Sequence, residues 1–342
     1  MDWFEQLTGF RETEYETTRQ QLELTGNQLR SRVNNRSYCV GELELTSLQQ
    51  LWQRGAAADT QSPGLRFRNI TADVRALHQE DSLNGAIFQV ASQFNLLEMV
   101  GPNVTPEQGV TRYQHDRTQG PACAIAAGAA TVYRNYFVPV AGQVGQTSTR
   151  QLDCLSDLGH ALAKQLGRSV NSLWTMRNGY ALCSPEGLEA IGEHLRNSSG
   201  VERDALRSLL RIGLHSNVEV TEGHNDRRPR LVSQAFCSAL PVAYTGINAS
   251  LWQPFAELVL EAAYEATLWA AAINAEWGCS NIVLLTQLGG GAFGNDPKWI
   301  RAAINRALKI FKHHELDVRL VSYGSVPACL RTLESIHDHV EF

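Results

Sequence analysis

An apolar run, a glycine-rich turn and the start of a helix follow one another in residues 282–300, IVLLTQLGGGAFGNDPKWI. The first four residues, IVLL, are typical of a short strand that is buried on both faces of a sheet. Asn295 or Asp296 can cap the helix that follows, and Pro297 suits its first position. A buried strand that leads directly into a helix is the repeating unit of parallel sheets, so this stretch indicates the α/β class.

The same alternation of apolar runs and helical patterns extends outward from this stretch. Strands are expected at 86–91, within 231–244, at 281–286 and at 317–323, and helices from Pro121, over 254–276 and over 297–312. Strands that are separated by helices of about ten residues or more need crossover connections. The sequence therefore predicts an α/β fold with a mixed sheet and helices on both faces.

The first 83 residues have a different pattern, in which helical and irregular elements dominate. Ser47 can cap a helix that begins at Leu48, and turn residues follow it. We therefore expect an N-terminal helical layer over residues 1–83, packed on a single compact unit over residues 84–342. No internal repeat or long linker divides the second part.

Composition excludes several classes of protein. The 342 residues are 43% hydrophobic and 19% charged, which is enough apolar material for a folded core. A net charge of −5 provides no basic surface for nucleic acid, and no apolar run reaches the length of about 18 residues that suggests a membrane span. The seven scattered cysteines form no CxxC pair, so we expect a reduced, cytoplasmic protein with neither a metal site nor a cofactor.

The glycine-rich turn carries the clearest chemical signal. Glycines lack the Cβ atom that keeps backbone N–H groups away from an anion, and a helix N-terminus favours negative charge. The candidate ligand-binding residues are Gly289, Gly290, Gly291, Ala292, Phe293 and Gly294. The Walker lysine and the ribose-binding acid of dinucleotide folds are both missing, so neither standard phosphate motif applies. A tight turn without any ligand remains the alternative.

A second candidate region lies between the predicted strand in 88–95, FQVASQFN, and the helix that Pro121 opens. Amides at the end of a strand and donors at a helix N-terminus are typical of the ligand crevice of α/β sheets. Asp116 is the acid of this region, and Thr118, Gln119 and Gly120 follow it. Asp116 could instead serve only to cap the helix.

A third candidate region, residues 214–228, reads LHSNVEVTEGHNDRR and is rich in acids and histidines. We interpret it as a loop before a buried strand. Glu219 and Glu222 could supply a general base, because neighbouring carboxylates shift each other's pKa. Polar loops also occur for no catalytic reason.

These regions together resemble the macrodomain superfamily, and within it the poly(ADP-ribose) glycohydrolase branch. Residues 284–300 resemble the strand, glycine-rich loop and helix that wrap the ADP-ribose diphosphate in that branch. Asn95 stands where the family has an asparagine that hydrogen-bonds the distal ribose. The resemblance covers residues 84–325. The part of the chain that corresponds to the family's catalytic loop comprises Asp116, Thr118, Gln119 and Gly120.

The chain departs from the family pattern at one point, because its first loop lacks the Gln-Glu-Glu sequence that carries the catalytic glutamate. In this respect it is similar to the MavL-like bacterial enzymes that remove ADP-ribose from arginine with loop carboxylates. The resemblance implies an ADP-ribosyl hydrolase that acts on ADP-ribosylated protein, with Asp116, Glu222 and Glu219 as catalytic residues.

Two other functions stay open at this point. One is a reader that binds ADP-ribose without cleaving it, which the missing Gln-Glu-Glu sequence favours. The other is an interaction protein that binds no ligand. The acids of the third candidate region favour the hydrolase.

Overall fold

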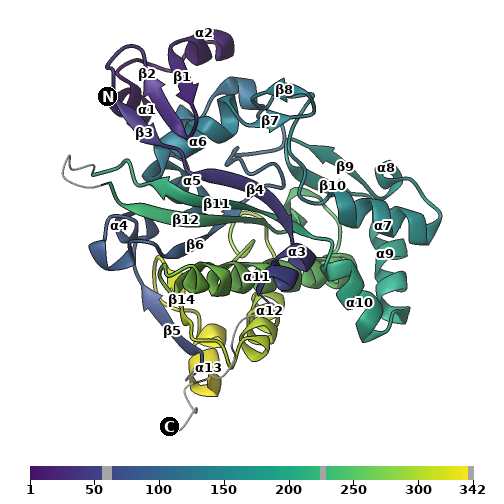
Figure 1. The fold of residues 1–342 in the computed structure, drawn as a ribbon. Helices are drawn as coiled ribbons and strands as arrows, with labels where there is room; N and C mark the ends of the chain where they lie inside the picture. Colours follow the sequence, from purple (N-terminus) through teal and green to yellow (C-terminus); the bar gives the residue numbers. More distant parts are fainter. Residues whose placement is uncertain (56–63, 224–228, 338–342) are drawn as a thin grey trace.

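A seven-stranded sheet forms the centre of the protein, in the order β4-β11-β12-β6-β13-β14-β5 (Figure 1). The structure is a computed structural model that describes residues 1–55, 64–223 and 229–337. The strands of the sheet are β4 (Glu42–Ser47), β5 (Arg66–Thr71), β6 (Ile87–Ser92), β11 (Arg211–Glu219), β12 (Leu231–Ser238), β13 (Ile282–Leu285) and β14 (Asp317–Ser322). The five strands from β12 to β5 are parallel. Strand β11 pairs antiparallel with both β12 and β4, so it runs opposite to the other six strands of this sheet. The predicted mixed sheet is confirmed.

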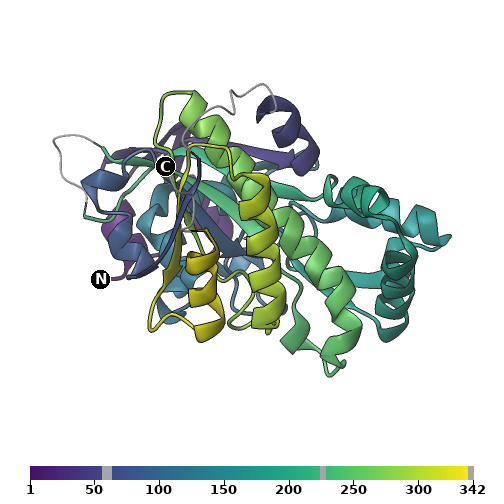
Figure 2. The same ribbon diagram turned by 90° about the horizontal axis from the view of Figure 1, so that it is seen from below.

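Helices cover both faces of this sheet (Figure 2). They include α4 (Val74–Leu77), α5 (Gln119–Ala126), α6 (Gly128–Tyr136), α11 (Ala249–Glu276) and α12 (Pro297–Ile310). On β12, Gln234 donates to the Cys123 carbonyl of α5, whereas Cys237 Sγ lies 3.5 Å from Thr267 Oγ1 of α11. Residues an odd number apart on a strand point to opposite faces, so α5 and α11 lie on opposite sides of the sheet, as expected.

Helix α11 is the long central helix, and about two thirds of its residues are buried. It begins at Ala249 rather than at Pro254, because the Asn248 side chain caps the N–H of Ser250 at 3.0 Å. Within the described residues, no helix combines the length and the apolar character that crossing a membrane requires.

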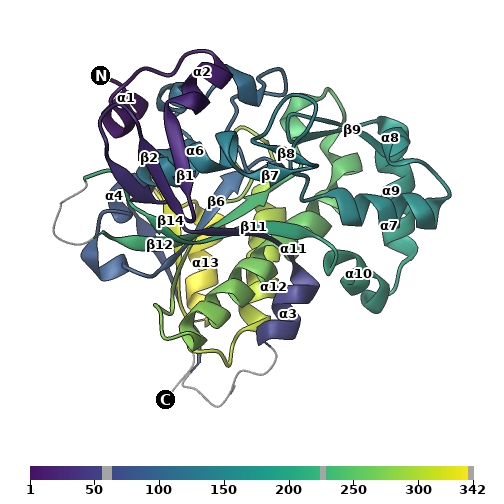
Figure 3. The same ribbon diagram turned by 45° about the horizontal axis from the view of Figure 1, so that its top comes forward.

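The predicted N-terminal helical layer is wrong in two respects. Residues 22–39 form a three-stranded antiparallel sheet, which lies with α1 (Trp3–Thr8) and α2 (Tyr15–Gln20) over α6 (Figure 3). Its strands are β1 (Leu22–Thr25), β2 (Gln28–Ser31) and β3 (Ser37–Cys39). In addition, β4 and β5 are the two edges of the central sheet, so this sheet takes strands from both sides of residue 84. Edge strands are half exposed and polar, which hides them in a search for apolar runs.

The remaining elements surround this core. A lobe beside α11 contains α7 (Ser156–Leu166), α8 (Val170–Leu173), β9 (Trp174–Arg177), β10 (Tyr180–Cys183), α9 (Pro185–Asn197) and α10 (Gly200–Arg207). Other short elements are α3 (Leu48–Gly55), β7 (Pro139–Val140), β8 (Gln143–Val144) and α13 (Ala328–His337).

Candidate functional site

One cleft of about 1100 Å³ lies at the carboxyl ends of the five parallel strands. Each of these strands is followed by residues that line it, among them Asp73 after β5, Glu98 after β6, Ala239 after β12, Gly289 after β13 and Tyr323 after β14. This edge is where α/β sheets bind their ligands. The volume is ample for a nucleotide-sized molecule.

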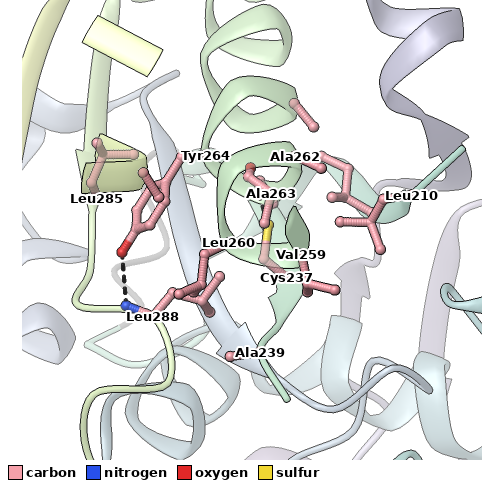
Figure 4. Close-up of a cluster of buried hydrophobic side chains, with 14 of the residues drawn as sticks. Leu210, Cys237, Ala239, Val259, Leu260, Ala262, Ala263, Tyr264, Leu285 and Leu288 are labelled. Atoms are coloured by element: carbon pink, nitrogen blue, oxygen red, sulfur yellow. Dashed lines mark hydrogen bonds between the residues drawn. The ribbon is translucent and has the colours of Figure 1, made fainter. Parts of the chain in front are cut away.

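The glycine-rich turn forms one wall of the cleft, and α11 holds the start of this turn in place. The Tyr264 hydroxyl donates to the Thr286 carbonyl at 2.7 Å. It also accepts the Leu288 N–H at 2.9 Å (Figure 4). Inside the turn, the Asn295 N–H donates to the Gly289 carbonyl at 3.0 Å. These bonds fix the backbone before any ligand binds.

Several backbone N–H groups of the turn have no hydrogen-bond partner in the described part of the chain. They belong to Gly289, Gly291, Ala292 and Phe293, all of which line the cleft. Gly290 also lines the cleft, but its N–H is used by the Gln287 carbonyl. Free donors on one fixed turn suit a diphosphate, since each phosphate oxygen can accept an N–H.

Two glycines of the turn have positive φ angles, 72° at Gly289 and 71° at Gly294. A Cβ at Gly289 would overlap Ala239, so this position requires glycine for both conformation and space. Gly294 does not line the cleft and serves to close the turn. Asp296 caps α12, which confirms one of the two predicted capping residues.

The predicted residues that precede α5 also lie in the cleft. Asp116 follows the short helical turn η3 (Thr111–His115), and its Oδ1 accepts both the N–H and the hydroxyl of Thr118, at 2.8 and 2.7 Å. Its Oδ2 has no partner among the residues that the structure describes. Asp116 therefore stabilises the start of α5 and still keeps one oxygen for a ligand.

Gln119 and Gly120 hold α5 against the sheet. The Gln119 side chain accepts the Ala91 N–H at 2.9 Å and donates to the Gln89 carbonyl at 2.8 Å. A Cβ at Gly120 would overlap the Ala91 carbonyl and the Glu98 carboxylate. Both residues line the cleft, and their packing brings the helix N-terminus close to Glu98.

Glu98 is the buried acid of the cleft that the sequence analysis missed; the other missed acid, Asp73, is exposed and caps α4. Its side chain lines the cleft although the residue is only 3% exposed, and its Oε1 has no hydrogen-bond partner among the described residues. Burial raises the pKa of the Glu98 carboxyl well above its ordinary value, and the charge of Asp116 adds to this rise. The Arg134 charge and the Ser92 hydroxyl oppose it. The sequence did contain a signal for a buried acid here, because Glu98 stands alone between two apolar residues, Leu97 and Met99.

This raised pKa predicts how stability depends on pH. The folded state keeps the Glu98 proton to higher pH than the unfolded chain does. The contribution of Glu98 to stability therefore falls as the pH rises from the pKa of Glu98 in the unfolded chain, about 4.3, to its raised pKa in the folded state. Glu98→Gln cannot ionise and should flatten this decline. Urea unfolding of wild type and Glu98→Gln at a series of pH values measures how the free energy of unfolding declines in each. Parallel curves for wild type and variant would contradict the assignment.

Aromatic rings form the wall of the cleft on the side of Glu98. The ring centroids of Tyr180, Tyr244 and Phe293 lie 5.1 to 5.5 Å apart, and all three residues line the cleft. The Tyr180 hydroxyl donates to the Met99 carbonyl at 2.6 Å, which ties this wall to the segment that carries Glu98. Such a wall can pack against the apolar face of a sugar.

Asn95 does not occupy the position that the resemblance implies. It is fully buried outside the cleft, where its Nδ2 donates to Gln151 at 2.8 Å and its Oδ1 accepts the Leu97 N–H at 3.1 Å. Its amide stabilises the turn after β6 and does not line the cleft. The structure therefore does not support the ribose contact that the resemblance implies for Asn95.

The interpretation of the third candidate region, residues 214–228, as a loop is also wrong for its first residues. Its first residues belong to β11, so 214–219 is a strand and not a loop, and residues 224–228 lie outside the described residues. Glu219 is paired in register with Leu231, the first residue of β12, and so lies at the edge of the sheet opposite the cleft. Its carboxylate accepts the Cys39 N–H at 2.7 Å.

Glu222 does not line the cleft either. It makes a two-pronged ion pair with Arg75, which does line the cleft. The geometry therefore favours a structural role for Glu219 and a supporting role for Glu222, instead of the catalytic roles expected from the sequence.

Comparison with known proteins gives a fold-level likeness to one class of enzyme. No protein-family model and no curated protein sequence matches the chain. The similar solved structures include poly(ADP-ribose) glycohydrolases. That of Thermomonospora curvata is 12% identical with a TM-score of 0.47, over 94% of this chain and 95% of that chain. That of Deinococcus radiodurans in complex with ADP-ribose is 11% identical with a TM-score of 0.42, over 86% and 93%.

Proposed function

We propose that this protein is an ADP-ribosyl hydrolase, which binds ADP-ribose in the cleft and releases it from a modified protein side chain. The observation that carries the proposal is the presence, in one cleft, of free backbone N–H groups on a fixed turn and of two carboxyl groups, Glu98 and Asp116. The first feature suits a diphosphate, and the second suits cleavage of a glycosidic bond.

The order of the strands supports this assignment of the two features. Strand β6, which leads to Glu98, lies beside β13, which leads to the glycine-rich turn, and β14 follows with Tyr323. A ligand along this edge meets carboxyl groups, then phosphate donors, then an exposed aromatic ring, 84% accessible at Tyr323. This is the order of the reacting ribose, the diphosphate and the adenine in ADP-ribose.

The two carboxyl groups can divide the chemistry between them. Glu98 keeps its proton and donates it to the leaving atom of the side chain as the bond to the anomeric carbon breaks. Asp116 accepts a proton from the water that attacks the same carbon through an oxocarbenium-like transition state. The products are free ADP-ribose and an unmodified side chain.

Arginine is the side chain that we propose as the attachment point. Before cleavage, the positive charge of a modified guanidinium is attracted to the Asp116 carboxylate, and such charge-assisted bonds are among the strongest in proteins. All seven cysteines lie in the described residues as free thiols, which supports action in a reducing compartment such as the cytoplasm.

A reader of ADP-ribose is the second candidate, because Asp116 already accepts two hydrogen bonds from Thr118 and could serve only as a cap. Incubation with an arginine-ADP-ribosylated peptide separates the two functions. Release of free ADP-ribose is expected for the hydrolase. Tight binding of ADP-ribose without release from arginine, serine or glutamate peptides would establish the reader instead.

Thermal unfolding with added ligands tests the binding mode. A ligand at about a hundredfold excess over its Kd stabilises the folded state by about 2.7 kcal/mol, which corresponds to a few degrees in Tm. The shift should be largest for ADP-ribose, smaller for NAD or ADP, and smallest for AMP, which lacks the second phosphate and the distal ribose. Equal shifts for AMP and ADP-ribose would contradict recognition by the glycine-rich turn. No shift from any ligand would indicate an interaction protein.

A further inference from the structure

The segment between α1 and α2 contacts η3, the short helical turn that precedes Asp116. One carboxylate, that of Glu12, accepts three hydrogen bonds there. Its Oε1 accepts from the Val110 N–H at 2.8 Å and from the Tyr136 hydroxyl at 2.7 Å, and its Oε2 accepts from the Thr111 N–H at 2.7 Å. The Trp3 indole donates to the Thr111 carbonyl at 3.1 Å. Glu12 and Trp3, both from the N-terminal layer, therefore hold Thr111, the first residue of η3.

The fit around Glu12 is close. Gly109 has a φ of 79°, and a Cβ at this position would overlap the Glu12 carboxylate. The chain therefore passes Glu12 where only a glycine fits. The contact belongs to a separate apolar cluster that joins the N-terminal layer to α6 and includes Trp3, Val110, Tyr113 and Tyr136.

The turn that Glu12 holds is bonded to both carboxyl-bearing residues of the cleft. Within η3, the Tyr113 hydroxyl accepts the Glu98 N–H at 3.0 Å. The Tyr113 carbonyl accepts the Asp116 N–H at 3.1 Å. The positions of Glu98 and Asp116 therefore depend on one residue, Tyr113, whose turn begins at the peptide that Glu12 binds.

We propose that Glu12 is a positioning residue of the active site: it fixes η3, and through Tyr113 it sets the placement of Asp116 and Glu98. The proposal rests on the proposed function for its catalytic meaning. Glu12 does not line the cleft, so it acts without touching the ligand. The N-terminal layer is then a necessary part of the hydrolase and not only a cover for α6 (Figure 3).

Glu12→Gln is the test variant, because its amide has a single acceptor oxygen. Whichever way the amide is turned, its NH₂ group faces Val110 N–H or Thr111 N–H, so at least one backbone N–H loses its partner. We expect kcat to fall by about tenfold or more, while the Kd for ADP-ribose changes by less than about twofold. Glu16→Gln, which removes the same charge from an exposed residue of α2 paired with Arg19, should leave both quantities unchanged.

Two further measurements separate positioning from general destabilisation. In a background that carries both Asp116→Asn and Glu98→Gln, Glu12→Gln should lower kcat little further, because residues that act on the same step are not additive. Amide hydrogen exchange at 110–116 should be faster in Glu12→Gln than in wild type or Glu16→Gln. A full additional loss of kcat in the background that lacks both acids, or an unchanged exchange rate at 110–116, would overturn the proposal.

The exchange measurement also keeps the two proposals distinguishable. If wild type cleaves no ADP-ribosylated peptide, the hydrolase proposal fails. Faster exchange at 110–116 in Glu12→Gln then still supports the anchoring of the turn, and unchanged exchange overturns it. If wild type is active and Glu12→Gln has the kcat of wild type, the positioning proposal fails and the hydrolase proposal stands.

Discussion

Glu98→Gln is expected to lower turnover of an arginine-ADP-ribosylated peptide by about two to four orders of magnitude, the range for general acid groups. The variant keeps the shape of the side chain but cannot donate the proton that burial holds on Glu98. Affinity for ADP-ribose should change little, because the phosphate donors belong to a different loop. Single-turnover kinetics together with calorimetric Kd values measure both effects.

Asp116→Asn should give a loss of similar size, since its carboxylate is the proposed acceptor of the proton from water. Glu189→Gln is the matched control, because it makes the same kind of change at an exposed residue of α9 that does not line the cleft. Wild-type turnover in Glu98→Gln and Asp116→Asn would place the chemistry elsewhere. Glu222→Gln should lower turnover less than either variant, since Glu222 acts only through its ion pair with Arg75. A loss as large as that of Asp116→Asn would restore the catalytic role expected from the sequence.

Gly291→Glu is expected to weaken ADP-ribose binding by at least tenfold, about 1.4 kcal/mol. Gly291 lines the cleft and its φ is not positive, and a Cβ at this position would meet no atom within 4 Å, so the turn can accept the side chain. The new carboxylate then lies beside the free N–H groups, where it competes with the diphosphate and repels it.

Gly200→Glu is the matched control for this variant. Gly200 begins α10 away from the cleft, and a Cβ there also meets no atom within 4 Å, so the substitution adds the same charge without a steric cost. Its affinity for ADP-ribose should equal that of wild type. Equal affinity in a folded Gly291→Glu protein would exclude the turn as the diphosphate site.

The strand-turn-helix unit could be predicted closely because its signals are local. The apolar run predicts β13 to within one residue, and Asp296 with Pro297 marks the start of α12. The free N–H groups of the turn follow from the glycines, because a backbone without Cβ atoms can leave its donors exposed. The cleft itself follows from the parallel strands that the crossover helices impose.

The edge strands could not be predicted in the same way. β4, ELELTS, and β5, RFRNIT, carry polar side chains because each has only one neighbouring strand and is partly exposed. Their pairing with β11 and β14 depends on hydrogen bonds to residues far along the chain. A search for long apolar runs therefore places them in a helical layer.

The sequence by itself determined the class of the fold, the glycine-rich turn and the presence of Asp116 beside α5, since periodicity, glycine content and capping act over a few residues. Only the tertiary structure decided which acids share the cleft. The antiparallel direction of β11 carries Glu219 to the opposite edge, and the packing of α5 buries Glu98 at the cleft wall. Burial and strand direction arise from contacts between distant segments, and such contacts also decide which carboxyl group holds a proton.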